Sequence, residues 1–328
     1  MFEEIISLEN LFVAWSEFQK GKALRGDVLE FESRLEDEIF RLHEDLENGR
    51  YRHGGYFEFF VQDPKRRHIH KASVRDRVLH HAIVRILNPV FERAFIYDSW
   101  SCRKEKGTHA AVDRLQHLAW KISKNNSQLV WVLQLDIRKF FDSMDHEVLL
   151  TLLERRIYDA KLLALLKEII ESFNPGLPLG NITSQLFANV YMNPLDQFMK
   201  HDLKMKGYLR YADDFVFIHS DRNYLENLIP SIQEFLLHHL KLRLHEGKIN
   251  MRKYRGGIDF LGYVSFPYHR VLRTRTKRRI FRKIEEKNLP SYLGVLEHCR
   301  SRGIQNAVFK KMKQEGLTLS VKRHYLNH

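Results

Sequence analysis

Two adjacent carboxylates, Asp213 and Asp214, interrupt the otherwise apolar and aromatic stretch from Gly207 to Ile218. This pattern predicts a β-hairpin whose strands are held by packing and whose turn carries the acids. Two neighbouring negative charges at the end of buried strands repel each other, and a cation or water is needed to offset that repulsion. Asp is also a common turn residue, so the pair alone is equally compatible with a solvated turn.

A third carboxylate, Asp136, ends the apolar run that begins at Trp131 and that predicts a buried strand. One acid from a strand and two from a neighbouring hairpin can hold two Mg²⁺ ions about 3.5–4 Å apart. Ions at that spacing suit in-line phosphoryl transfer, in which one activates a hydroxyl and the other stabilises the leaving group. The three acids therefore predict metal-dependent nucleotidyl transfer, with Mn²⁺ as an alternative ion.

The charge of the chain predicts a polyanionic partner. Among 328 residues, 54 are Lys or Arg and 41 are Asp or Glu, which gives a formal net charge of +13. Nucleic acid is the commonest partner of such a basic protein, although solubility alone also accounts for the charge. Basic residues are densest between Lys65 and Arg77 and after Arg270, where we expect either phosphate contacts or a solvated basic face.

The remaining composition disfavours several classes of protein. A hydrophobic content of 44% with 12% aromatic residues indicates a globular chain. The two cysteines, Cys102 and Cys299, lie far apart, so we predict neither a disulfide framework nor a cysteine-based zinc site. We find no signal peptide and no apolar run of the ~18–20 residues that a membrane helix requires. We therefore expect a cytoplasmic protein without a membrane partner.

Four histidines, His68, His70, His80 and His81, lie close together in the sequence. Such a group can bind a transition metal, but no arrangement of cysteines or carboxylates accompanies it in the sequence. We therefore interpret these residues as core or surface histidines rather than as metal ligands.

Helical periodicity dominates three parts of the chain. It predicts amphipathic helices over residues 1–50, helical structure over 146–173 and a helix over 182–195. The Gly- and Pro-rich residues 174–181 predict a loop between the last two.

Six blocks of sequence resemble, in the same order, those of bacterial retroelement reverse transcriptases, and the resemblance covers roughly residues 30–300. The blocks are Arg75-Asp76-Arg77-Val78; Leu135-Asp136-Ile137 with Phe140-Phe141-Asp142; Gly176-Leu177-Pro178-Leu179-Gly180-Asn181-Ile182-Thr183-Ser184-Gln185; Tyr211-Ala212-Asp213-Asp214; the region around Lys248; and Asp259-Phe260-Leu261-Gly262-Tyr263. Tyr-x-Asp-Asp alone is weakly specific, whereas six ordered blocks are very specific.

The resemblance implies an α+β right-hand polymerase, with fingers, a palm whose antiparallel sheet carries the catalytic acids, and a short helical thumb. We accordingly expect an N-terminal helical segment at 1–50, fingers at 51–125, and a palm at 126–265 with finger-side insertions around 146–180. The thumb and C-terminal helices would occupy residues 266–328.

The resemblance also implies roles for single residues. The metal ligands would be Asp136, Asp213, Asp214 and, through its carbonyl, Ile137. Lys248 would act as general acid for pyrophosphate, and Phe141 would exclude a 2′-hydroxyl, with an ordinary core Phe as the alternative. The residues that contact the incoming triphosphate would be Lys65, Arg67 and Arg75. The loop residues beside the substrate would be Leu179, Gly180 and Gln185.

One departure refines the family. Many reverse transcriptases have Gln-Gly and Ser-Pro where this chain has Leu179-Gly180 and Ser184-Gln185, and this version is similar to the enzymes of diversity-generating retroelements. The resemblance implies cDNA synthesis from a template-repeat RNA with errors at template adenines. An aliphatic Leu179 in place of Gln removes a polar contact near the nucleotide, and lost hydrogen bonds weaken discrimination. The implied partners are template RNA, a DNA or RNA primer, dNTPs and a small basic accessory protein oligomer.

Two alternatives stay open. The chain could be the reverse transcriptase of a group II intron, a retron or a phage-defence system, although we see no room for the longer thumb and maturase region of an intron enzyme or for an RNase H, endonuclease or integrase. It could also be a catalytically silent nucleic-acid-binding protein. The three intact acids disfavour the silent protein, because a binding protein has no reason to keep a repulsive cluster.

Overall fold

The computed structural model describes residues 1–62, 66–285 and 288–314. Lys65, predicted to contact the triphosphate, lies outside the described residues. The described chain combines helices with antiparallel sheets, which confirms the predicted α+β class. Within the described ranges, no helix combines the length and the apolar character that crossing a membrane requires.

A four-stranded sheet in the order β4-β5-β3-β6 forms the centre of the molecule. Its strands, all paired with antiparallel neighbours, are β3 (Trp131–Asp136), β4 (Tyr208–Tyr211), β5 (Asp214–His219) and β6 (Asn250–Lys253). The predicted strand that ends at Asp136 and the predicted hairpin at Asp213-Asp214 are therefore confirmed.

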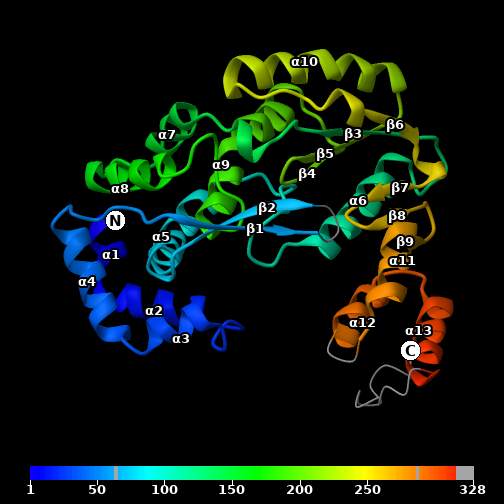
Figure 1. Cartoon of the computed structure of the whole chain (residues 1–328). Helices are drawn as coiled ribbons and strands as arrows, with labels where there is room; N and C mark the ends of the chain where they lie inside the picture. The colour runs from blue at the N-terminus through cyan, green and yellow to red at the C-terminus, as the bar shows by residue number, and fades with distance from the viewer. Residues whose placement is uncertain (63–65, 286–287, 315–328) are drawn as a thin grey trace.

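Both faces of this sheet are buried, because side chains alternate along each strand. On one face Leu133 and Phe215 join the core that is shared with α9 (Ile182–Gln197) and α10 (Arg222–Leu240). On the other face apolar side chains such as Val216 pack in a second core with α6 (Thr108–Ile122). Figure 1 shows α10 lying along one side of the sheet.

The helical content predicted over residues 146–173 is confirmed, and it is divided between two helices, α7 (His146–Glu154) and α8 (Ala160–Glu171). Asp159 begins the second helix, because its carboxylate accepts a hydrogen bond from the Leu162 backbone N–H at 3.2 Å and so caps a free donor. The apolar periodicity continues across this break, which is why the sequence did not reveal it.

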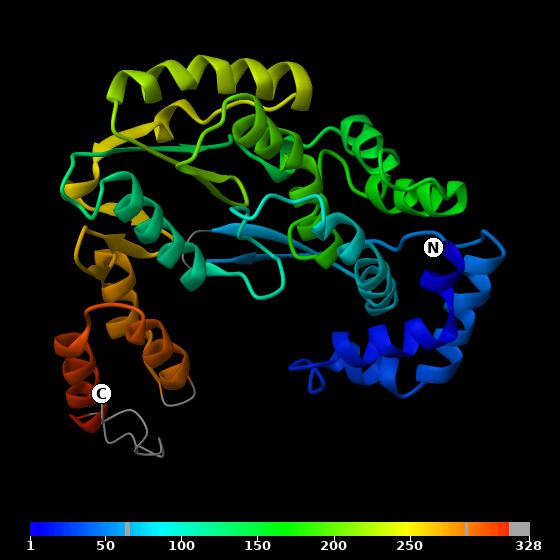
Figure 2. The same ribbon diagram turned by 180° about the vertical axis from the view of Figure 1, so that it is seen from behind.

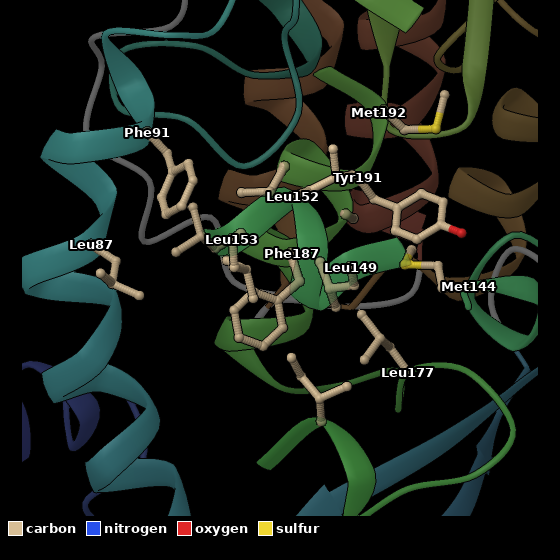
Figure 3. Close-up of a cluster of buried hydrophobic side chains, with 14 of the residues drawn as sticks. Leu87, Phe91, Met144, Leu149, Leu152, Leu153, Leu177, Phe187, Tyr191 and Met192 are labelled. Carbon is tan, nitrogen blue, oxygen red and sulfur yellow. The ribbon is translucent and has the colours of Figure 1, made fainter. Parts of the chain in front are cut away.

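Helix α7 packs on α9 and faces α5 (Val74–Glu92) across a shared core. Figure 3 shows Leu149 and Leu153 of α7 beside Phe187 of α9, with Leu87 of α5 opposite. These side chains are completely or almost completely buried. This core fixes the position of α9, whose side chains support the hairpin of β4 and β5.

The N-terminal helices form a separate layer against α5, and the predicted helical content of residues 1–50 is confirmed. They are α1 (Phe2–Ile6), α2 (Leu8–Phe18), α3 (Gly26–Glu32) and α4 (Leu35–Glu47). Between them and the palm sheet, β1 (Tyr56–Val61) and β2 (Arg67–Ala72) make a long antiparallel hairpin, visible from both sides in Figures 1 and 2.

The C-terminal part starts with a three-stranded sheet and continues as helices. The strands are β7 (Ile258–Phe260), β8 (Tyr263–Ser265) and β9 (Arg270–Leu272), and the helices are α11 (Thr274–Lys283), α12 (Leu289–Glu297) and α13 (Arg302–Gln314). The shorter helical segments of the chain are η1 (Phe141–Ser143), η2 (Phe198–Asp202), η3 (Glu246–Lys248) and η4 (Tyr254–Gly256).

The elements are arranged as a right hand. In Figure 2 the N-terminal helices and the C-terminal helices lie on opposite sides, with the sheet and α10 joining them. Strand β9 pairs with β8, so the small sheet continues past residue 265, where we placed the end of the palm. The boundaries expected for fingers, palm and thumb stay a prediction.

Candidate active site

Three carboxylates converge at one end of the central sheet. Asp136 is the last residue of β3 and lies directly opposite Asp214, the first residue of β5, in the antiparallel register. Asp213 lies in the two-residue turn between β4 and β5, next to Ala212, whose φ of +53° is left-handed. The geometry therefore gathers the three acids that the sequence singled out.

Burial and mutual repulsion keep two of these acids from ionising easily. Burial, followed by the charge of Asp136, raises the pKa of Asp213. Burial and the charges of Asp213 and Asp136 raise the pKa of Asp214 to about 7, and its carboxyl hydrogen-bonds to Asp136. Bound cations would favour the charged forms of these carboxyls, and carboxylate oxygens are the donors that Mg²⁺ prefers.

Lys248 supplies the nearest cation. Its Nζ lies 2.7 and 2.6 Å from the two carboxylate oxygens of Asp136. The segment that carries it is tied to the end of β3, because the His245 N–H donates to the Asp136 carbonyl at 2.8 Å and Leu244 forms a β-bridge with Ile137. The structure therefore brings Lys248 and Ile137 to the acids, as a role in the site requires.

A cavity of about 670 Å³ opens beside Asp136 and Asp214. Arg67 from the finger hairpin lines it, and the charge of Arg67 lowers the pKa of Asp213 against the larger effect of burial. Helix α11 lines the far side with a group of cations, namely Arg275, Arg278, Arg279 and Arg282. Such a ring of cations around carboxylates suits a polyanionic substrate held beside metal ions.

The turn between β4 and β5 rests on a buried ion pair that sequence analysis missed. Arg210 of β4 and Asp196 of α9 are both fully buried, and they form two hydrogen bonds of 2.8 and 2.7 Å. The other guanidinium donors reach Ser99 at 3.0 Å, Asn189 at 3.3 Å and the Ala212 carbonyl at 3.0 Å. All five N–H donors of Arg210 are satisfied, and one of them holds the turn that carries Asp213.

A signal for this network was present in the sequence. Arg210 interrupts an apolar strand, and a charge inside a buried strand must find a partner. Its partner could not be named from the sequence, since Asp196 lies on another element.

The backbone of Phe141 contacts the backbone of the loop that follows α8. The Leu177 N–H donates to the Phe141 carbonyl at 2.9 Å. At Gly176, with φ of +71°, an added Cβ would lie 2.0 Å from the same carbonyl, so only Gly fits this approach. The Phe141 ring is partly buried and contacts Phe140 edge-on, which is compatible with both the gate and the core interpretation.

The same loop also contacts the finger hairpin. The Leu179 carbonyl accepts a hydrogen bond from the His70 N–H at 2.9 Å, and an added Cβ on Gly180 would lie 2.8 Å from Ile69. Leu179 is partly buried, whereas Gln185 is exposed on the first turns of α9. Leu179 and Gly180 therefore lie beside the strand that carries Arg67.

Arg75 takes a different position from the one expected. Its guanidinium lies 2.8 Å from the Asp45 carboxylate of α4 and stacks over the ring of Tyr51. It lines a separate cavity, together with Asp27 of α3. The first turn of α5 aims this side chain at the N-terminal helices, so the structure does not bring Arg75 to the acids.

The chain is similar in sequence to known proteins. The sequence profile described as reverse transcriptase (RNA-dependent DNA polymerase) matches residues 62–265. Protein YkfC of Escherichia coli (strain K12) is 25% identical over 291 residues, which cover 75% of this chain and 74% of YkfC. The group II intron-encoded protein LtrA of Lactococcus lactis subsp. cremoris is 26% identical over 184 residues, 52% of this chain and 29% of LtrA.

Solved structures show the same fold at low sequence identity. The telomerase from Candida albicans, in complex with the TWJ fragment of telomeric RNA, superposes with a TM-score of 0.54 at 12% identity. The superposition covers 84% of this chain and 60% of that telomerase. The chain thus spans less than two thirds of LtrA and of this telomerase, and the structural likeness bears on the fold alone.

Asp214→Asn should stabilise the protein at pH 8 in the absence of divalent metal. Because the pKa of Asp214 is raised, the native state binds more protons than the unfolded state between about pH 4 and 7, and stability falls as pH rises through that window. The neutral amide avoids the penalty and can still donate to Asp136. We expect a gain of roughly 2–4 kcal/mol at pH 8 and a much smaller gain near pH 4.

Thermal and urea unfolding of both proteins in EDTA would measure this gain. Added Mg²⁺ should then stabilise the wild type more than the variant. A variant that is less stable than the wild type at pH 8 would contradict the electrostatic account.

Asp196→Asn should destabilise the protein by about 3–5 kcal/mol, because it leaves the buried Arg210 guanidinium without its counter-charge. The matched control is Glu226→Gln, which removes the acid of the exposed Arg222–Glu226 pair on α10 and should cost at most about 0.5 kcal/mol. Urea unfolding measures both. Equal costs for the two variants would show that the buried pair does not support the turn.

Proposed function

We propose, from the premise that this chain belongs to the reverse transcriptase (RNA-dependent DNA polymerase) family, that Asp136, Asp213 and Asp214 form its DNA-synthesising centre. The observation that carries the proposal is the register of β3 and β5, which sets Asp136 opposite Asp214 with Asp213 in the adjoining turn. The family supplies the reaction, RNA-directed DNA synthesis, and the convergence of the acids supports this location for it.

The donor set fits two Mg²⁺ ions, with Mn²⁺ as an alternative. All three side chains offer oxygen, and the Ile137 carbonyl is next in the chain. Burial, as the largest cause, raises the pKa values of Asp213 and Asp214, and bound cations would lower them again. When bound, such ions promote ionisation of a primer 3′-hydroxyl and stabilise the charge of a leaving pyrophosphate.

Residues around the acids have complementary tasks in this proposal. Arg67 binds the triphosphate of the incoming dNTP from the finger side, and the arginines of α11 bind the phosphates of the template–primer duplex. Lys248, within reach of Asp136, donates a proton to pyrophosphate. Phe141 excludes the 2′-hydroxyl of a ribonucleotide. The resemblance also implies substrate contacts for Lys65, Arg75 and Gln185. The Arg75 guanidinium lies 2.8 Å from the Asp45 carboxylate, which indicates a structural task for Arg75 instead.

We further propose that the enzyme serves a diversity-generating retroelement. The support is the block from Leu179 to Gln185, in which an aliphatic residue stands where many relatives have Gln. The Leu179 carbonyl is hydrogen-bonded to His70 of β2, the strand that also carries Arg67. The enzyme would copy a template-repeat RNA with errors at adenines and would act with a small basic accessory protein oligomer.

A group II intron-type enzyme is the second candidate. Its support is the similarity to LtrA and to further intron-encoded proteins, including an uncharacterised 91 kDa protein in the cob intron of Schizosaccharomyces pombe. The two candidates share the acids and differ in template: a template-repeat RNA in one, an intron RNA in the other. The error pattern of the product separates them.

Asp213→Asn should abolish cDNA synthesis while leaving RNA affinity within about twofold, because it removes one metal-binding charge and leaves the basic surface intact. Primer extension on a defined RNA template with Mg²⁺ and dNTPs measures the first quantity, and filter binding of the same RNA measures the second. The exposed Asp221→Asn variant, at the N-terminus of α10, is a control that should retain both. Equal loss of synthesis and RNA binding in Asp213→Asn would mean that Asp213 is structural.

Leu179→Gln should lower misincorporation opposite template adenines by several-fold, because the amide restores a hydrogen-bonding group near the nucleotide. Sequencing of cDNA made by the wild type and the variant measures the error at each template base. Leu179→Met, which changes shape but adds no amide, is the matched control and should keep the wild-type error. A wild type that copies all four bases accurately would favour the intron-type enzyme.

A further inference from the structure

The finger hairpin brings a carboxylate to two of the four clustered histidines. Glu58 of β1 is the direct partner of His70 of β2 in the antiparallel register. His68 lies two residues before His70, so both imidazoles emerge from the same face of β2. His80 and His81 take no part, because they pack against His53 and Phe18 respectively.

The three side chains present their ligand atoms to one point. The Nε2 atom of His68 lies 3.0 Å from one oxygen of Glu58, and the Nε2 atom of His70 lies 3.8 Å from the other. One ligand atom from each residue can be chosen so that all lie within 4.8 Å of one another. Ligands of a tetrahedral zinc ion with bonds near 2.0–2.1 Å are about 3.3 Å apart, so small rotamer shifts are enough.

Aromatic side chains enclose this group on two sides. Phe60 stacks on the His68 ring at 4.4 Å, and Phe173 contacts the His70 ring edge-on at 4.5 Å. The backbone of His70 is also fixed, because its N–H donates to the Leu179 carbonyl and its carbonyl accepts from the Asn181 side chain at 3.1 Å. A strand pair with a fixed backbone, and aromatic rings packed on both imidazoles, holds these ligands in place.

We propose that Glu58, His68 and His70 bind one Zn²⁺ ion. Two neutral imidazoles and one carboxylate are a three-ligand set that zinc accepts, with the fourth position open to water. Imidazole nitrogens disfavour Mg²⁺, which prefers oxygen ligands, so the site is chemically distinct from the three-aspartate cluster. The ion would join β1 to β2 on the face opposite to Arg67.

This assignment departs from the sequence interpretation of these histidines. The sequence offered no carboxylate in a recognisable arrangement with them, whereas the strand pairing supplies Glu58. An ion pair between Glu58 and a protonated histidine explains the contacts without metal, and that explanation is the one to be excluded.

Titration calorimetry of the purified full chain with Zn²⁺, in a buffer that contains Mg²⁺, tests the proposal. We expect one zinc ion per chain at this site and a zinc-dependent rise of the unfolding temperature. The variants His68→Gln, His70→Gln and Glu58→Gln should each weaken zinc binding by roughly 100-fold, since even changes behind the ligands cost about 10–100-fold.

The control is His298→Gln. His298 also faces another histidine, His109, at a ring-centroid distance of 3.7 Å, so it reports adventitious binding by paired imidazoles. It should leave the high-affinity site unchanged. Unfolding temperatures of all variants in EDTA separate loss of zinc from loss of fold. A wild type without a one-to-one zinc site, or a site that survives in the three hairpin variants, would overturn the proposal.

Discussion

The register between β3 and β5 is the constraint on which the site depends. It sets Asp136 opposite Asp214, and a slip by one residue would send one set of side chains to the other face of the sheet. Burial of both faces excludes such a slip, because Leu133 packs on the side of α9 and α10 while Val132 packs on the side of α6. Apolar packing on two sides therefore forces three like charges into proximity.

Residues that take no part in the proposed chemistry hold the acids in place against this repulsion. Arg210 forms an ion pair with Asp196 of α9 and donates a hydrogen bond to the Ala212 carbonyl in the turn. An ion pair buried to this extent offers little net stability over an apolar pair, but it has a fixed geometry because each donor needs its own acceptor. We interpret it as the element that keeps the turn in place while the acids carry charge.

The sequence predicted what depends on local pattern, namely the strand that ends at Asp136, the hairpin turn and the helical N-terminus. It did not predict features that depend on residues in another element of the fold. Because the apolar periodicity continues through residues 146–173, it did not show that a second helix begins after Asp159. The residues around Arg75 likewise gave no sign that Asp45 is its partner. The carboxylate opposite His70 was equally hidden, because cross-strand neighbours depend on a register that the residues of one strand do not reveal.

The hairpin of β1 and β2 carries different chemical groups on its two faces. Side chains alternate along β2, so His68 and His70 lie on the opposite face of the strand from Arg67, which lines the cavity of the acids. The loop that carries Leu179 is hydrogen-bonded to the backbone of His70 and, at Leu177, to the backbone of Phe141. A zinc ion bound by His68 and His70 would therefore restrain β2, the strand that carries Arg67, together with the loop that is hydrogen-bonded to it.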